Sequence, residues 1–504
     1  MKTAINISLA LIFLLTFATS CYKDHGNYDY VAIAPLAIQD TLISGQIYVQ
    51  QGGTLRLTPQ VQLNGNAEDF SYDWFVYLNS ASASYVQDST RISTSKNLDY
   101  TVDPNIFTIG EDYKLTYKVT NNRNGLSYYY FYQLTVSDLF TQGWIFLEEK
   151  NNTADLSMVL KSGEIYRQIY SFRNADSPIK DPVSFTISPR SISDAVGPDG
   201  KKFYIVGKSD AIELDGTTMK KRFDFNYLFF TPPTSKAPSY IAWGGAGTSN
   251  LGLLVNKGNL HVNQVGGFPG AKKFTTQLTS PSNGYDYVLA PQYTPGNRIN
   301  NVSDIYDIIM YDQKNKRFYD VSAGALKKFD DVAINTSVFD MNNVGLDLIK
   351  LDSSNVQTLR NAIMKDSDGK GYLLRFKTTR SAEDPYITVS KAEIKAPGIA
   401  QALDAVCSTL TPHLFYAFDG KLYRYEVTSD TYKEAFSFGA GETLTRIKFE
   451  RHGYGLNTPR LVLATWNGVE GKVYYLPVGA DGNVGTLDKT YTGFGKIIDM
   501  ELKF

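Results

Sequence analysis

The residue types that bind metals or activate nucleophiles are few in this chain and widely spaced. Its four histidines are His25, His261, His413 and His452, and no two of them form a His-x-x-x-His or His-x-His pair. A zinc site of ordinary spacing is therefore not expected. Cys407 follows a turn or helical segment and is interpreted as a buried, inert thiol. We predict no bound metal ion and no cofactor.

Two further motifs resemble binding loops but lack a decisive residue. Asp366-Ser367-Asp368-Gly369 is similar to the start of a calcium loop, but Lys377 stands where the bidentate glutamate would be. The glycine run at 244–247 has neither the Lys-Ser/Thr of a phosphate-binding loop nor a βαβ setting. No Gly-x-Ser-x-Gly elbow occurs. We therefore expect no catalytic residue that a linear motif would reveal, and the sequence leaves open whether the protein is an enzyme.

Aromatic side chains in or beside long loops are the remaining candidates for ligand binding. Rings offer rigid, amphipathic contact area at a low cost in conformational entropy. The candidates are Tyr240, Trp243, Tyr285, Tyr287, Tyr293 and Trp466. For each of them the alternative is packing in a hydrophobic core.

The composition indicates which elements must position these rings. With 504 residues the chain exceeds the size of one hydrophobic core, so at least two domains are expected. Its 35 Tyr, 28 Phe and 40 Gly favour strands joined by tight turns, and hence an all-β fold. Lys plus Arg number 50 and Asp plus Glu number 51, so no net field attracts nucleic acid. We expect no nucleic-acid partner.

Residues 1–20 have the pattern of a secretory signal. Lys2 supplies the positive start, and an uncharged run follows with its apolar centre at 10–15. The apolar stretch is short for a membrane-spanning helix, which needs about 20 apolar residues. The small residues 18–20 lead into Cys21, an arrangement that resembles a bacterial lipoprotein signal and implies that Cys21 is lipidated. The alternative is an ordinary cleaved signal peptide with an incidental cysteine.

Residues 21–30 are polar and rich in turn formers, so they are predicted to form a tether. Lys23-Asp24 resembles the signal that sends lipoproteins to the outer cell surface in Bacteroidetes. We therefore expect an outer-membrane protein, anchored by lipid alone and exposed at the cell surface.

Residues 31–138 are predicted to form an immunoglobulin-like or PKD-like β-sandwich. Alternation of period two, typical of strands with one face in solvent, recurs at 54–57, 72–77 and 113–119. Trp74 is expected to fill the core, and Tyr113 to form a tyrosine corner with its hydroxyl tied to the backbone. Alternate rings of the run 128–132 must face opposite ways. The exposed rings either bind a sugar or peptide or pack against the next domain.

Residues 139–504 are predicted to form a seven-bladed β-propeller. A polar turn, usually with Gly and Lys, runs into an apolar residue and then a ring, and the pattern occurs seven times, ending at positions 166, 204, 261, 319, 372, 423 and 474. The period is about 50 residues, the length of one four-stranded blade. Two stacked sandwiches are the alternative, but they would not explain seven similar hairpins.

Two segments of this region need separate interpretation. The alternating tail at 495–504 is predicted to complete the first blade. The segment 352–365 is predicted to be a helical insertion between blades four and five, because its Leu-Arg-Asn-Ala-Ile-Met run looks helical.

The lipid-cysteine signal, the tether at 26–30, the Tyr72-Asp73-Trp74 strand and the repeat-bearing remainder together resemble the PKD-like surface lipoproteins of Bacteroidetes. The resemblance implies an accessory subunit of a SusC/SusD-like outer-membrane importer. Its ligands would be oligopeptides or glycans. Our first hypothesis is therefore a noncatalytic binding protein. The alternatives are a surface hydrolase or lyase with its active site in the propeller loops, and a structural or adhesive module.

Overall fold

The computed structural model describes residues 37–39, 46–62, 66–78, 89–103, 105–108, 111–137, 142–188, 201–244, 251–264, 273–296, 304–329, 338–380, 383, 386–452 and 456–503. Contacts divide the chain into two compact units, Met1–Ser137 and Asp138–Phe504. The lipid attachment predicted at Cys21 lies outside the described residues.

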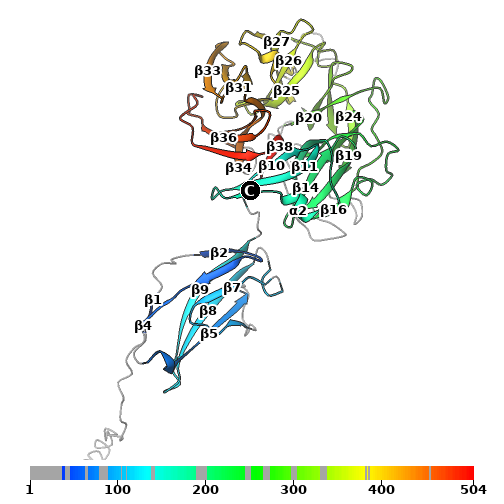
Figure 1. Ribbon diagram of the computed structural model, residues 1–504. Coiled ribbons are helices and arrows are strands. Elements are labelled where there is room, and N and C mark those ends of the chain that lie inside the picture. The colour runs from blue at the N-terminus through cyan, green and yellow to red at the C-terminus, as the bar shows by residue number, and fades with distance from the viewer. Residues whose placement is uncertain are drawn as a thin grey trace, which may run out of the picture. The chain divides into compact units, whose positions relative to one another are not determined.

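Unit 1 is a sandwich of antiparallel strands with one parallel pair (Figure 1). One sheet has the order β2-β9-β8-β5-β6, and the other strands form the pairs β3-β7 and β1-β4. The strands are β1 (Ala37–Gln39), β2 (Gln46–Gln50), β3 (Thr54–Leu57), β4 (Gln60–Gln62), β5 (Phe70–Leu78), β6 (Thr90–Ser93), β7 (Leu98–Thr101), β8 (Asp112–Asn121) and β9 (Ser127–Ser137). A 3-10 helix, η1, spans Ala67–Asp69.

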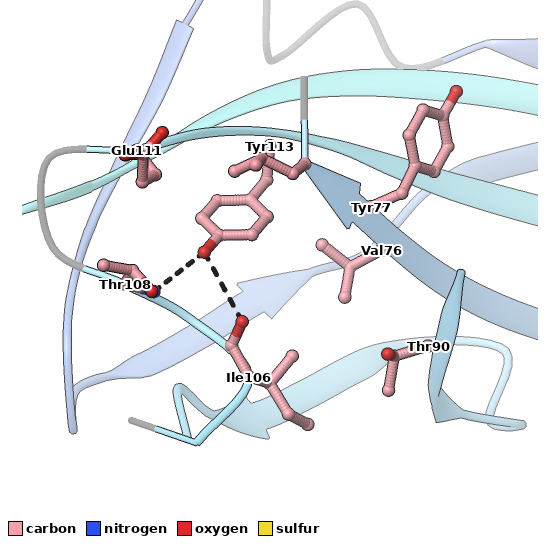
Figure 2. Close-up of a pocket in the computed structure, with 8 residues that line it drawn as sticks. Val76, Tyr77, Thr90, Ile106, Thr108, Glu111 and Tyr113 are labelled. Atoms are coloured by element: carbon pink, nitrogen blue, oxygen red, sulfur yellow. Dashed lines mark hydrogen bonds between the residues drawn. The ribbon is translucent and has the colours of Figure 1, made fainter. Parts of the chain in front are cut away.

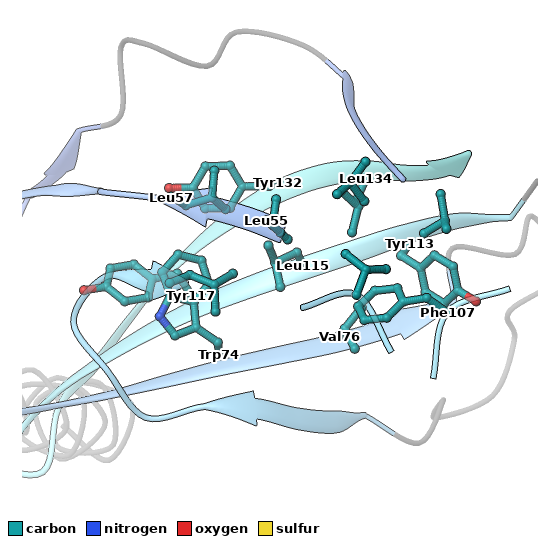
Figure 3. Packing of buried hydrophobic residues seen from close by; sticks show 14 of the residues in the cluster. Leu55, Leu57, Trp74, Val76, Phe107, Tyr113, Leu115, Tyr117, Tyr132 and Leu134 are labelled. Atoms are coloured by element: carbon teal, nitrogen blue, oxygen red, sulfur yellow. The ribbon is translucent and has the colours of Figure 1, made fainter. Parts of the chain in front are cut away.

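The core of unit 1 is formed by alternate residues of these strands (Figure 3). Trp74 is fully buried, as predicted, and its indole nitrogen donates to the carbonyl of Ser95 at 2.9 Å. Along β9, Tyr132 and Leu134 point into the core while Tyr129 and Phe131 are exposed. Alternate rings of this run therefore do face opposite ways, as the period of a strand requires.

The tyrosine corner predicted at Tyr113 is confirmed. Its hydroxyl accepts a hydrogen bond from the backbone N–H of Thr108 at 2.8 Å and donates to the carbonyl of Ile106 at 3.4 Å. These bonds join the start of β8 to the preceding loop. The corner thus fixes the entry of the chain into the central strand of the sheet.

Unit 2 contains seven antiparallel sheets of three or four strands in its described residues, which we number in chain order (Figure 1). Sheet 1 consists of β38 (Lys496–Lys503), β10 (Gly143–Lys150), β11 (Thr153–Leu160) and β12 (Ile165–Tyr166). Sheet 2 consists of β13 (Pro182–Ile187), β14 (Lys202–Gly207), β15 (Ala211–Asp215) and β16 (Lys221–Asp224). Sheet 3 consists of β17 (Pro238–Gly244), β18 (Leu251–Asn256) and β19 (Asn259–Gln264).

Sheet 4 consists of β20 (Leu289–Pro295), β22 (Ile308–Asp312), β23 (Arg317–Ser322) and β24 (Ala325–Lys327), and sheet 5 of β25 (Asp347–Ser353), β26 (Leu359–Lys365), β27 (Gly371–Lys377) and β29 (Thr388–Ile394). Sheet 6 consists of β30 (Ala405–Cys407), β31 (His413–Phe418), β32 (Lys421–Glu426) and β33 (Thr431–Ser437), and sheet 7 of β34 (Thr443–His452), β35 (Leu456–Trp466), β36 (Gly471–Pro477) and β37 (Lys489–Phe494).

Three short elements complete unit 2. They are the pair β21 (Asp304–Ile305) with β28 (Thr379–Arg380), the helix α2 (Ile169–Arg173) and the 3-10 helix η3 (Ile399–Gln401). The prediction of an all-β protein, an immunoglobulin-like or PKD-like sandwich followed by a β-propeller, is confirmed.

The first strand of each sheet lies against the first strands of its two neighbours, and together these strands close a ring. We call β38, β13, β17, β20, β25, β30 and β34 the inner ring. The closing strand is β38, which pairs with β10 from Gly143 opposite Lys503 to Glu149 opposite Lys496. The prediction that the C-terminal strand completes the first blade is therefore confirmed.

The structure corrects two details of the sequence interpretation. The segment 352–365 is not a helical insertion, because β25 ends at Ser353 and β26 covers Leu359–Lys365, as two strands of sheet 5. Five of the seven predicted hairpin turns connect the second and third strands of sheets 3 to 7. The turn at 162–164 instead connects the third and fourth strands of sheet 1. The turn predicted at 199–201 falls largely outside the described residues, between β13 and β14.

Candidate functional site: the inner ring of the propeller

Every junction between neighbouring strands of the inner ring is bridged by a side chain. Uncharged side chains bridge three junctions: Thr186 donates to the carbonyl of Ile241 at 2.6 Å, Tyr293 donates to that of Trp243 at 2.9 Å, and Gln292 bonds Ile349 and Leu351. Charged side chains bridge the other four. The ring is thus held by hydrogen bonds as well as by packing.

The charged cluster of the ring is centred on Lys448 of β34. Its ammonium group lies 2.7 Å from Glu501 and 3.4 Å from Asp499, both on the closing strand β38. Arg446 lies 3.9 Å from Asp499. Asp499 also accepts the backbone N–H of Phe185 on β13 at 3.0 Å, so it links sheets 7, 1 and 2.

The electrostatics of this cluster keep both partners ionised. Burial raises the pKa of Asp499, but Lys448, Arg446 and the backbone N–H of Phe185 outweigh burial and hold the pKa below its ordinary value. Burial lowers the pKa of Lys448, while Asp499 and Glu501 raise it more strongly. The Lys448 side chain is 28% exposed, so solvent still reaches this part of the ring.

A second charged link joins sheets 5, 6 and 7. Lys350 of β25 donates to Asp404 at 2.7 Å, and the other oxygen of Asp404 accepts the backbone N–H of Ile447 at 3.2 Å. Asp352 accepts the backbone N–H of Cys407 at 2.8 Å. These carboxylates satisfy backbone donors of the next sheet, so they position strands.

Two of the ring residues predicted to bind ligand lie on strands of the inner ring. Tyr240 of β17 and Tyr293 of β20 are half-buried, with ring centroids 6.4 Å apart. Burial, and then the charges of Tyr293, Glu501 and Asp499, raise the pKa of Tyr240 well above its ordinary value. The carboxylates of β38 therefore act on Tyr240 through the field inside the ring.

The other predicted ring residues have different surroundings. Trp243 lies next to the pair but is buried in the core between sheets. Tyr287 is buried, and its hydroxyl donates to Leu278 at 2.7 Å and accepts from Leu260 at 3.0 Å. Tyr285 is exposed in a turn, and Trp466 is half-buried at the end of β35. The six residues do not form one cluster, and a binding role for each stays a prediction.

Sequence reasoning missed the charged residues of the ring. Lys448, Asp499 and Glu501 belong to two strands about fifty residues apart and form no linear motif. The available signal was an acidic pair at alternate positions of the predicted closing strand. Its partner cation could be found only by locating the neighbouring inner strand.

A shallow hollow of about 360 Å³ lies at the tyrosine corner of unit 1 (Figure 2). It is lined by Val76, Tyr77, Leu78, Thr90, Ile106, Thr108, Glu111 and Tyr113. Glu111 is the one ionisable carboxyl among these lining residues, and the Tyr113 hydroxyl is already bonded to the backbone. The hollow therefore offers no acid and base pair.

The described parts of the chain contain no group of three or more His, Cys, Asp or Glu side chains arranged to hold a metal ion. His261 and Cys407 are buried, as predicted. None of the helices found among the described residues is long and apolar enough to cross a membrane.

The fold defines the protein as a β-sandwich joined to a β-propeller, and residues 21–179 match the PKD-like family. That match covers β1 to β12. No curated protein shows significant similarity to the sequence.

Several solved structures match this chain at low sequence identity. A quinonprotein alcohol dehydrogenase-like protein from Bacteroides thetaiotaomicron is 14% identical, with 92% of this chain and 98% of that chain covered and a TM-score of 0.43. A DUF4784 family protein from Bacteroides caccae is 9% identical, with 93% and 98% covered and a TM-score of 0.31. The Nup133 β-propeller domain of Vanderwaltozyma polyspora is 9% identical, with 71% and 94% covered and a TM-score of 0.34.

Proposed function

We propose that the protein is a noncatalytic surface lipoprotein that binds oligopeptides or glycans at its propeller, as an accessory subunit of a SusC/SusD-like outer-membrane importer. The observation that carries the binding role is the pair of half-buried rings Tyr240 and Tyr293 on neighbouring inner strands, in a ring that also holds Lys448, Asp499 and Glu501. Rings, hydroxyl groups and charges of both signs lie together there. This combination suits a ligand with apolar faces and polar edges.

The charged residues of the ring support binding over catalysis. Asp499 and Asp404 each accept a backbone N–H of a neighbouring sheet, and each is also paired with a lysine. Carboxylates engaged in this way hold strands in place, whereas a catalytic acid or base must be able to exchange its proton with the substrate.

The anchoring part of the proposal has separate support. The PKD-like match begins at residue 21, which is the cysteine predicted to carry the lipid. A lipid-anchored protein needs no spanning segment, because acyl chains contribute about 0.8 kcal/mol per buried CH₂.

Binding is tested with the chain from residue 22 onward, by calorimetric titration with panels of oligopeptides and glycans. Tyr240→Ala is expected to weaken binding by about tenfold or more, as truncation of a central ring does. Tyr285→Ala, which removes an exposed ring, is the matched control. Equal affinities of both variants and the parent would exclude the inner ring as the site.

The alternative function, a surface hydrolase or lyase, is tested by product analysis in the same incubations. Release of smaller peptides or sugars would mean that the protein is an enzyme and not a noncatalytic binding protein. The partner is tested by purification from native outer membranes, where repeated absence of a SusC/SusD-like pair would remove that part of the proposal. Labelling of intact cells, compared with Cys21→Ser, tests the anchor and its exposure.

A further inference from the structure

The solvent-facing side of the large sheet of unit 1 carries an aromatic surface. Phe75 on β5 lies opposite Thr116 on β8, and Thr116 lies opposite Phe131 on β9, so the three form one row across the sheet. Phe131 is 50% exposed and its neighbour Tyr129 is 54% exposed. Thr116 is only 7% exposed, because the flanking rings cover it.

Cations lie among these rings. The Lys114 ammonium group is 4.0 Å from the ring centroid of Phe131 and 5.8 Å from that of Tyr77. Lys118 lies opposite Tyr129 on the next row. On its other side, Lys118 lies opposite Asp73 of β5. We call Phe75, Tyr77, Lys114, Lys118, Tyr129 and Phe131 the outer face.

The charge of the outer face is unbalanced. Arg91, whose guanidinium lies 5.5 Å from the Phe75 ring, is paired with Asp73 at 3.2 Å, and Asp73 also lies opposite Lys118. With Asp112 at an alternate position of β8, the cations Arg91, Lys114 and Lys118 exceed the carboxylates on this side of the sheet by one. A contiguous exposed surface of rings marks an interaction site more often than single exposed rings do. Its positive charge favours an anionic partner.

The backbone of the sheet limits how a ligand can bind. β8 is paired with β5 from Tyr113 to Asn121 and with β9 from Asp112 to Thr120, so its backbone is engaged on both sides. β2 pairs with β9 only from Gln133 to Ser137. A ligand that lies over β8 therefore meets the ring surfaces and ammonium groups of the outer face.

We propose that the outer face is a second binding site, for acidic glycans whose sugar rings stack on Tyr129 and Phe131 while their carboxylates bind Lys114 and Lys118. Sugar rings present a flat C–H surface to an aromatic ring, and a carboxylate forms a charge-assisted hydrogen bond with an ammonium group. This site lies in unit 1 and does not depend on the binding role proposed for the inner ring.

The experiment measures binding of oligogalacturonate to the chain from residue 22 onward. Lys114→Gln and Phe131→Ser are each expected to weaken binding by roughly tenfold, which corresponds to the loss of one charged hydrogen bond or one binding ring. Methyl-esterified oligogalacturonate, which lacks the negative charges, is expected to bind weakly to the parent. Raising the salt concentration is expected to weaken binding of the acidic form.

Matched controls come from β33, where Tyr432 is 52% exposed and Lys433 is its neighbour. Tyr432→Ser and Lys433→Gln are expected to bind like the parent. Thermal unfolding of all variants establishes that they are folded.

Equal binding by the folded Lys114→Gln, Phe131→Ser and control variants would overturn the proposal. So would equal affinity for the esterified form, or binding to anionic lipid vesicles without binding to oligogalacturonate. Inner-ring variants such as Tyr240→Ala separate the two proposals, because they leave the outer face unchanged.

Discussion

The two halves of the inner ring join their sheets by different chemistry. Between β13, β17, β20 and β25 the bridges are a threonine, a tyrosine and a glutamine. Between β25, β30, β34, β38 and β13 they are carboxylates, two of them paired with lysines. One half of the ring therefore depends on protonation state and salt, and the other half does not.

The comparison also separates two kinds of stabilisation. A neutral hydrogen bond between strands contributes about 1 kcal/mol, and its loss is local. In a paired buried charge, removal of one partner leaves the other without compensation, which costs more than the pair itself contributes. The charged half should therefore be the more sensitive to single substitutions.

Deletion of residues 496–503 is the strongest test, since it removes the strand that closes the ring between β34 and β13. Ile497 and Met500 are fully buried, and loss of two such side chains alone costs about 4–10 kcal/mol. That is comparable with the whole stability of a domain, about 5–15 kcal/mol. We expect no cooperative unfolding transition for unit 2 by calorimetry. A transition at the parent temperature would contradict the closure described for β38.

Lys448→Met tests the charged half. The variant leaves Asp499 and Glu501 on β38 without their shared cation, and we expect a loss of about 3 kcal/mol in the free energy of unfolding, measured by urea titration. Lys433→Met on an exposed strand is the control and should change little. A loss no larger than in the control would mean that the cluster does not hold the ring.

Lowering the pH tests the charged half of the ring without a substitution. The pKa of Asp499 is lower in the folded state than in the unfolded state, so its contribution is present above its unfolded pKa of about 4 and is lost as pH falls through the folded pKa. Unfolding free energies between pH 5 and pH 2 should fall less steeply in Asp499→Asn than in the parent. Parallel pH profiles would contradict this prediction.

Tyr293→Phe tests the neutral half and should have the smallest effect. It removes one hydroxyl and leaves the carbonyl of Trp243 without that donor, so we expect a loss of about 1 kcal/mol that does not vary with pH or salt. Tyr285→Phe, in an exposed turn, should leave stability unchanged. A loss as large as that of Lys448→Met would remove the distinction between the halves.

The local features of the fold could be predicted because strand alternation and turn residues can be recognised within short segments of the sequence. Trp74, the corner at Tyr113 and the closing strand were all found in this way. The segment 359–364 was misread because every residue of it is buried, which removes the alternation that distinguishes a strand from a helix. The ring charges were missed because their partners are distant in sequence.

The first predicted hairpin turn was assigned to the wrong pair of strands for a related reason. In sheet 1 the inner strand comes from the end of the chain, so β10 takes the second position, and the turn at 162–164 comes one strand later than in sheets 3 to 7. A repeat identified from turns alone does not reveal such a permutation. Tyr240 and Tyr293 were selected as rings in loops, but both belong to inner strands.

The position of β38 has a consequence for the timing of folding. The strands of unit 1 are complete at residue 137, whereas the inner ring needs residues 496–503, which are synthesised much later. At about 5–20 residues per second, roughly 20 to 70 s separate the two events. Throughout that interval β10 lacks its inner neighbour, so the incomplete propeller exposes an unpaired strand edge with which other chains can pair.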